Sequence, residues 1–188
     1  TQNPSLISSI SAITGVTTGQ TLVGMDFRPA NNMLYALGYD ATNNNAQLYT
    51  INTNSGIATA VTNPPIALML GTVTVGFDFN PTVDRIRVVS SNGANYRLEP
   101  TTGTLSATDG TLSFASGDAN FGANPRAGTV AYTNSYNTTT TTTLYNYDEV
   151  LNIITTQVPP NNGTLNTIGS SGITVNPALI KLCFCRED

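Results

Sequence analysis

The chain has 188 residues, of which only 10% are charged, and its formal net charge at pH 7 is −4. Its seven lysines and arginines are scattered, so no basic run can neutralise a row of phosphates and we expect no nucleic-acid partner. The longest apolar run, 64–70, is too short to cross a bilayer and begins with two prolines, so we expect no membrane insertion.

The first predicted strand covers 6–13, where Leu6 and Ile10 belong to an alternating pattern. We interpret it as an orphan strand, the last of a four-stranded unit whose other three strands are absent from this chain.

An internal repeat follows. The segment VGMDFRP at 23–29 recurs as VGFDFNP at 75–81, with five of seven residues identical. Within each copy the large apolar residues alternate with Gly and Asp, which is the period of two that a strand requires. A second strand pattern follows each copy after a turn-like segment, at 33–37 and at 85–89. Each copy therefore predicts a β-hairpin.

Two more strand patterns follow each hairpin, separated by a turn that ends in glycine. A third copy of these later patterns comes further along the chain. The predicted third and fourth strands are 47–51 with 57–61, 95–99 with 104–108, and 143–147 with 151–156.

Tyrosines mark the predicted third strands. Tyr49, Tyr96 and Tyr145 follow one another at intervals of 47 and 49 residues, a spacing typical of a four-stranded propeller blade. We therefore predict an all-β fold with about three four-stranded antiparallel blades of the propeller type, in a single domain over 1–188. The predicted blades cover 21–62, 73–109 and 127–157, and a tail covers 173–188.

The number of blades leaves the array open or incomplete within one chain, because closed propellers typically have four to eight blades. Open sheet edges need cover, and another copy of the chain is the expected partner. Copies would either close a ring or add strand to strand in a head-to-tail polymer. The candidate assembly strands contain Leu6, Ile10, Ile173, Val175 and Leu179.

Several long motifs resemble one known family. They are GQTLVGMDFRPANNMLYALG, QLYTINTNSG, FDFNPTVDRIRVVSSNGANYRLEPTTG, DGTLSFASGDANFGANPRAGTVAYTNS and PPNNGTLNTIG. Over roughly 6–172 they are similar to domain-of-unknown-function family 4394, found in exported bacterial proteins. The resemblance implies a repeat fold and export, and it implies no activity. We expect the start of the family's first repeat and its last repeat to be missing here, and the tail from 176 matches no known pattern.

Catalytic chemistry is restricted because the chain contains no histidine, the usual general base, serine activator and metal ligand. We expect no catalytic residue, no cofactor and no metal. Paired carboxylates remain a route to glycoside hydrolysis. In a repeat protein, an acid at an equivalent place more often accepts hydrogen bonds from the adjoining turn, and we favour that role for Asp26 and Asp78. The candidate acids are Asp26, Asp78, Asp84, Asp109 and Asp118.

Two further patterns have structural interpretations. The segment 116–122 has alternating oxygen donors but lacks the several carboxylates of a calcium loop, so we favour a glycine-rich connection. Arg85 and Arg87 share one face of a strand and suit either a bound carboxylate or sugar acid, or pairing with Asp84 or Glu99 on a solvated face. We favour the pairing.

Two sequons for N-linked glycans lie at Asn137 and Asn162, both beside predicted turns. The first opens a run of six threonines at 138–143. This run is either an edge strand or a set of acceptors for O-linked sugar, with Thr138, Thr139 and Thr140 as candidates.

The two cysteines of the chain, Cys183 and Cys185, lie close to its last residue. They are too close in sequence for an easy mutual bridge, so they either form an intermolecular disulfide or belong to an inert tail. The lack of other thiols fits an oxidising compartment.

We expect a non-enzymatic structural protein, extracellular or at the cell surface, whose copies assemble by strand or edge exchange into an assembly such as a filament. The alternative is a monomeric carbohydrate-binding or carboxylate-dependent glycan-processing propeller module. The expected partners are other copies of the chain and, in the alternative, glycans.

Overall fold

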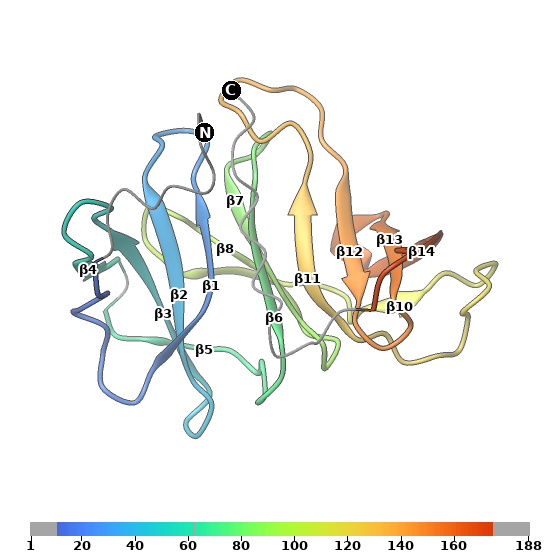
Figure 1. The fold of residues 1–188 in the computed structure, drawn as a ribbon, viewed down its shortest axis with the longest axis horizontal. Coiled ribbons are helices and arrows are strands. Elements are labelled where there is room, and N and C mark those ends of the chain that lie inside the picture. Colours follow the sequence, from blue (N-terminus) through green and yellow to red (C-terminus); the bar gives the residue numbers. More distant parts are fainter. Residues whose placement is uncertain (1–10, 62, 175–188) are drawn as a thin grey trace.

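The computed structural model describes residues 11–61 and 63–174, whose strands form three mainly antiparallel sheets lying side by side (Figure 1). The described residues contain no α-helix, and their helical turn is the 3-10 segment η1 (Pro160–Asn162). The predicted all-β fold is therefore confirmed. In this part of the chain no helix is long and apolar enough to span a membrane.

The first sheet is an antiparallel meander of four strands, with a short fifth strand paired to the third. Its second and third strands are buried along most of their length, as expected for strands packed on both faces. The strands are β1 (Thr21–Phe27), β2 (Leu34–Asp40), β3 (Asn45–Ile51), β4 (Ala58–Ala60) and β5 (Ile66–Ala67).

The second sheet repeats this meander with four strands. The turn before the fourth strand is the same in both sheets. Gly56 donates to the carbonyl of Asn52 at 2.8 Å, and Gly103 donates to that of Glu99 at 2.7 Å. Both glycines have positive φ, 73° and 66°, which explains why the turns end in glycine. The strands are β6 (Val75–Asn80), β7 (Arg85–Ser90), β8 (Asn95–Leu98) and β9 (Leu105–Thr108).

The third sheet is again a four-stranded meander, and β10 adds to its outer edge in parallel. Its last strand lies beyond 157, where the predicted blade ended. None of the three described sheets closes on itself, which is consistent with open, propeller-like blades. The strands are β10 (Ser113–Phe114), β11 (Ala127–Tyr132), β12 (Leu144–Asp148), β13 (Ile153–Gln157) and β14 (Thr164–Ser170).

The predicted position of Tyr145 is wrong. It lies on β12, the second strand of its sheet, whereas Tyr49 and Tyr96 lie on third strands. The first strand β11 reads AGTVAY and lacks the Asp-Phe signature of β1 and β6, and a long loop separates it from β12. Without that signature, matching on tyrosine spacing placed the segment 143–147 one strand too late.

The first strands β1, β6 and β11 lie next to one another near the middle of the molecule (Figure 1). A Cβ atom at Gly24 would lie 2.4 Å from the Cβ of Phe77, and one at Gly76 would lie 2.8 Å from the backbone nitrogen of Val130. Such approaches leave no room for a side chain. The close packing of these strands explains the glycine in both copies of the repeat.

The core lies in the two interfaces between neighbouring sheets, which we call seams. The first seam, between the first and second sheets, contains Tyr35, Leu37, Leu48, Phe77 and Phe79. The second seam, between the second and third sheets, contains Val89, Val130, Tyr132, Leu144 and Leu165. A third cluster lies on the far face of the first sheet and contains Ala36, Tyr49, Ile51 and Ala58.

Two tyrosine hydroxyls hold the segments that lead into the first two sheets. The Tyr49 hydroxyl accepts a hydrogen bond from the backbone of Thr17 at 3.0 Å, and that of Tyr96 accepts one from Met69 at 3.2 Å. Thr17 and Met69 are 52 residues apart, as are Asp26 and Asp78. In the first two sheets, the repeated tyrosine therefore holds the third strand to the segment that leads into the sheet.

The structure describes only residues 11–13 of the predicted orphan strand at 6–13. Residues 6–10 lie outside the described residues, and 11–13 are not in a strand. Thr14 instead forms a parallel bridge with Ile57, donating to the carbonyl of Gly56 at 3.1 Å. The segment joins the outer edge of the first sheet because the edge there has free backbone groups to pair.

Candidate functional site

Asp26 on β1 and Asp78 on β6 form a buried pair of acids. The two carboxyl groups hydrogen-bond to each other. Asp26 also accepts from the backbone nitrogen of Phe79 at 3.0 Å, and Asp78 accepts from that of Tyr132 at 2.6 Å. The prediction that these acids accept hydrogen bonds from adjoining turns is wrong, because each side chain points across a seam. Each acid ties the first strand of its sheet to that of the next.

Burial sets the charge state of this pair. Desolvation raises the pKa of Asp26, although hydrogen bonds from Phe79, Asp78 and Phe27 oppose the rise. Desolvation and then the negative charge of Asp26 raise the pKa of Asp78 well above its ordinary value. Two adjacent acids of this kind resist ionising together.

A pair of adjacent acids is chemically competent for acid–base work, but here both carboxyl groups are engaged by backbone donors and are nearly inaccessible. The structure brings together only two of the five candidate acids. The others occupy separate places, where Asp84 contacts Arg28, Asp109 contacts two arginines, and Asp118 contacts Thr167.

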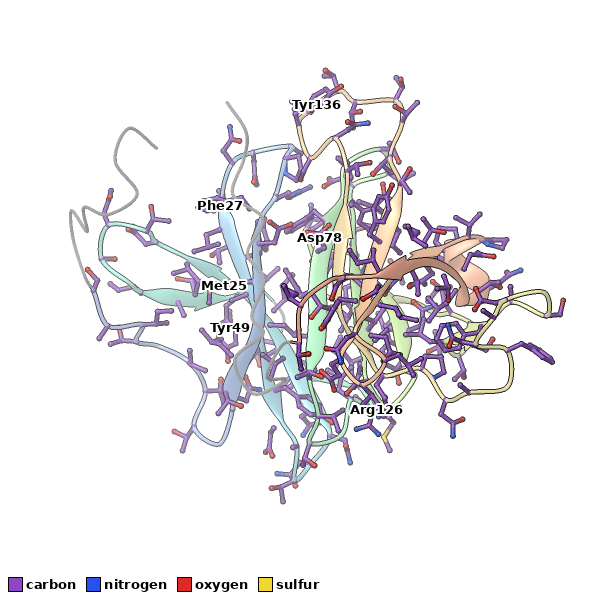
Figure 2. The ribbon with its side chains drawn as sticks, turned by 45° about the vertical axis from the view of Figure 1, so that its right-hand side comes forward. Met25, Phe27, Tyr49, Asp78, Arg126 and Tyr136 are labelled. Atoms are coloured by element: carbon purple, nitrogen blue, oxygen red, sulfur yellow. The ribbon has the colours of Figure 1, made fainter. Side chains whose placement is uncertain are left out.

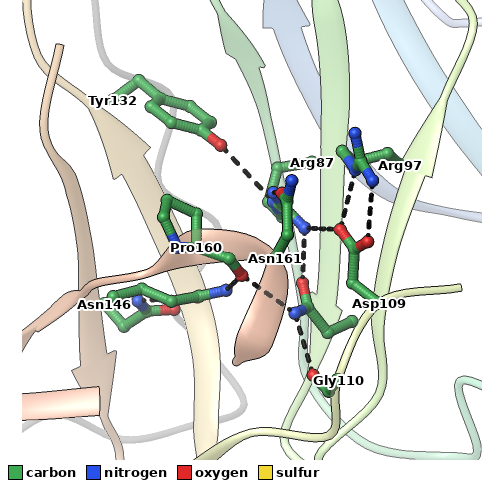
Figure 3. A network of polar contacts seen from close by, with 10 residues as sticks. Arg87, Arg97, Asp109, Gly110, Tyr132, Asn146, Pro160 and Asn161 are labelled. Atoms are coloured by element: carbon green, nitrogen blue, oxygen red, sulfur yellow. Dashed lines mark hydrogen bonds and ion pairs between the residues drawn. The ribbon is translucent and has the colours of Figure 1, made fainter. Parts of the chain in front are cut away.

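A second buried cluster surrounds Arg87 on β7 (Figure 3). Its guanidinium lies 2.5 Å from a carboxylate oxygen of Asp109, and Arg97 grips the same carboxylate with two hydrogen bonds, of 2.8 and 2.9 Å. Only 2% of the Arg87 side chain and 5% of that of Asp109 are exposed, so the charges neutralise each other away from water.

This cluster also crosses the second seam. Arg87 donates to the amide oxygens of Asn95 and Asn161, both at 2.8 Å, and the Asn95 amide donates to the carbonyls of Gly110 and Pro160 (Figure 3). Because Asn161 and Pro160 belong to η1 of the third sheet, the network joins two sheets.

The preferred interpretation of the two neighbouring arginines holds for one of them. Arg85 pairs with Glu99 at 3.0 Å on a partly exposed surface, as favoured. The predicted pairing on a solvated face is wrong for Arg87, because the third sheet covers that end of the strand and buries the guanidinium.

Another ion pair joins two hairpin turns across the first seam. Arg28 follows β1 and grips both carboxylate oxygens of Asp84, which precedes β7, with one contact at 2.8 Å. The guanidinium also lies 5.9 Å from the ring centre of Tyr35. Hydrogen bonding to Asp84 raises the pKa of Arg28. This ion pair holds the first two sheets together.

The segment 116–122 connects β10 to β11. Asp118 accepts hydrogen bonds from the backbone of Asn120 at 2.8 Å and from the hydroxyl of Thr167 at 2.7 Å. These bonds anchor the segment to β14. Within the described ranges, no group of three or more Asp, Glu, His or Cys side chains could hold a metal ion.

The candidate glycosylation residues lie in loops. Asn137 and Thr140 are exposed in the loop between β11 and β12, whereas Thr139 is buried. Asn162 is exposed in η1. The edge-strand alternative for the threonine run is wrong, because Thr138 has a φ of 69° and the run forms no strand.

The far face of the first sheet carries an exposed aromatic residue, whereas the aromatic residues at the equivalent places of the other two sheets are buried. Phe27 on β1 is 42% exposed, whereas Phe79 and Tyr132, at the same place on β6 and β11, are 0% and 6% exposed. Figure 2 shows Phe27 and Met25 along β1 of the first sheet. The repeat that aligns Phe27 with Phe79 is the sequence signal from which this face could have been found.

Most candidate assembly residues lie outside the described residues: Leu6, Ile10, Val175, Leu179, Cys183 and Cys185. Ile173 is described, and it is exposed and not in a strand.

The fold and these contacts define a class of all-β protein in which successive four-stranded sheets are fastened to one another by buried acids and arginines. The chain belongs to the family described as Domain of unknown function (DUF4394), which matches residues 1–179. A comparison with curated proteins gives no match.

Proposed function

We propose that this protein is a non-enzymatic structural subunit of an extracellular or cell-surface assembly, in which copies join through their outermost sheets. The observation that carries the proposal is Phe27, which stands exposed at a place where both equivalent aromatic residues are buried by a neighbouring sheet.

The polar clusters support a structural role. Each of the three described clusters of charged side chains crosses a seam or fastens neighbouring strands, and the charged groups contact one another. Groups used in this way maintain the arrangement of the sheets.

Low charge and exposed hydroxyl-rich loops support a place outside the cell. Asn137 and Asn162 are both exposed, so a glycan could be attached to either without disturbing a strand. Such glycans are part of the proposal. Mass spectrometry of protein from its native source would find the added mass on the peptides that contain these residues.

The assembly is tested by measuring the mass of the full chain with light scattering over a hundredfold range of concentration. We expect a mass above that of one chain, rising with concentration until it reaches a plateau. A single-chain mass at every concentration would contradict the proposal.

The second candidate is a glycan-processing module, favoured by the adjacent acids Asp26 and Asp78, whose pKa values are both raised. Their burial opposes it, since a sugar must reach both acids. Activity on a panel of polysaccharides, lost in Asp78→Asn and kept in Asp118→Asn, would support this candidate, and no activity in the unaltered chain would reject it.

A further inference from the structure

The two outermost faces of the array differ from each other. We call the far face of the first sheet the first flank; it includes Leu22, Met25, Phe27 and Leu34. We call the far face of the third sheet the last flank; it includes Tyr145, Tyr147, Ile154 and Thr156. None of these eight side chains is charged, and most are partly exposed.

Each flank corresponds to one side of the first seam. On the last flank, Tyr145 stands opposite the first strand of its sheet as Tyr35 does, and Ile154 stands opposite Tyr147 as Leu48 stands opposite Leu37. Leu48 is fully buried by the second sheet, whereas Ile154 is 38% exposed.

The first flank corresponds to the other side of that seam. Met25 and Phe27 occupy the places of Phe77 and Phe79, which pack against the first sheet. The two flanks are therefore complementary in the same way as the two sides of an interface that already exists within the chain.

We infer that two copies of this chain pack last flank to first flank twice, closing a six-bladed ring about a twofold axis. This inference rests on the proposed function and names its partner and geometry. The three blades that the structure describes in one chain make six in a pair, within the usual range for closed propellers. Head-to-tail contacts close into a ring when the rotation between successive blades returns to its start, which is the condition that a six-bladed propeller meets.

Backbone hydrogen bonding agrees with this contact. In both internal seams an aspartate of the earlier sheet accepts the backbone N–H of an aromatic residue on the later sheet. The third sheet has Ala131 at that place, and so offers no acceptor. None is needed, because the backbone N–H of Phe27 already donates to its own neighbour Asp26 at 2.7 Å. The contact would therefore not leave the backbone N–H of Phe27 buried without a partner.

The leading segment of the first sheet already lies in position. In the first seam, Leu68 from the segment that precedes β6 is buried in the core. Val16, 52 residues earlier, packs against the corresponding cluster of the first flank, where the Tyr49 hydroxyl holds Thr17. Val16 is still partly exposed, as expected for a seam that lacks its second side.

The test uses one substitution on each flank, Phe27→Asp and Ile154→Asp. We expect the unaltered chain to have the mass of two copies by native mass spectrometry and light scattering, and each variant to lose half of that mass. Mixing the two variants should restore the two-copy mass, because the intact last flank of one fits the intact first flank of the other. Val83→Asp, at an exposed apolar position in a turn outside both flanks, is the matched control and should keep two copies.

Circular dichroism of each variant establishes that it is folded before its mass is interpreted. Open chains of many copies would overturn the ring and leave the assembly standing. A two-copy particle that only one of the substitutions dissociates, or folded variants that do not complement on mixing, would also overturn it. A single-chain mass at every concentration would overturn both the ring and the proposed function.

Discussion

At the scale of single residues, the repeated aspartate links the first strands of neighbouring sheets by hydrogen bonds. Asp26 and Asp78 accept backbone N–H groups that would otherwise be buried without partners when neighbouring strands approach this closely. The cost is desolvation of two acids, visible as their raised pKa values.

These raised pKa values predict that protonation of the Asp26–Asp78 pair stabilises the fold. The ordinary pKa of aspartate is 3.8, so above that pH the unfolded chain has lost protons that the folded pair retains. The contribution of this pair to the free energy of unfolding is therefore greatest below pH 3.8, and it falls as the pH rises through the raised pKa values of the folded state. Asp78→Asn keeps an acceptor for Tyr132 and removes the second charge. We expect a flatter pH profile and a gain of roughly 1 kcal/mol at pH 7, measured by urea unfolding between pH 4 and 8.

The control for this prediction is Asp40→Asn, at an exposed acid whose pKa is lowered by hydrogen bonds from Asn43. It should leave the decline between pH 4 and 8 in place. An unchanged decline in Asp78→Asn would show that the pair is not its source.

Thr155 on β13 carries a buried hydroxyl with no hydrogen-bond partner, facing the amide of Asn146, whose oxygen also has none. Thr155 stands where the first two sheets have Tyr49 and Tyr96, and its short side chain makes no such tether. Thr155→Val should therefore raise the free energy of unfolding by about 1 kcal/mol in urea titrations, because an unsatisfied polar group is removed. Thr167→Val, which loses hydroxyl bonds to Asp118 and Asn120, should instead lower it. Equal losses in both variants would contradict this account.

At the scale of elements, the arrangement depends on how closely the first strands pack. Gly76→Ala would place a methyl group 2.8 Å from the backbone of β11, which cannot move without disturbing its sheet. We expect a loss of roughly 1–3 kcal/mol in the free energy of unfolding, from overpacking. Gly117→Ala is the matched control, since nothing lies within 4 Å of its added atom. Thermal unfolding of both variants checks the difference, and similar melting temperatures would count against close packing as the reason for the glycine.

Turn chemistry holds the signal that would have placed the third sheet correctly. The segments 39–44 and 147–152 both read Tyr-Asp followed by three residues and Asn. In each, the aspartate caps the turn and the tyrosine hydroxyl donates to the asparagine, at 2.9 Å from Tyr39 and 2.7 Å from Tyr147. This pair of turns joins second to third strands in both sheets. It was missed because tyrosine spacing alone cannot tell one strand of a meander from the next.

At the scale of the whole molecule, the free energy of unfolding depends on association if copies join through their flanks. Binding that occurs only in the folded state raises the melting temperature as protein concentration rises. We expect such a rise for the unaltered chain, measured by differential scanning fluorimetry over a hundredfold range of concentration. Phe27→Asp should show none. A melting temperature independent of concentration in both would speak against association.

The sequence by itself determined the strands and turns of the first two sheets, because alternation, glycine at positive φ and the repeat at 23–29 and 75–81 are local or directly comparable patterns. Only the tertiary structure decided what Asp26, Asp78 and Arg87 contact. Alternation tells which side chains share a face of a strand, but it does not tell which face meets a neighbouring sheet. Whether a polar side chain is solvated or buried in a seam therefore depends on packing between residues far apart in the chain.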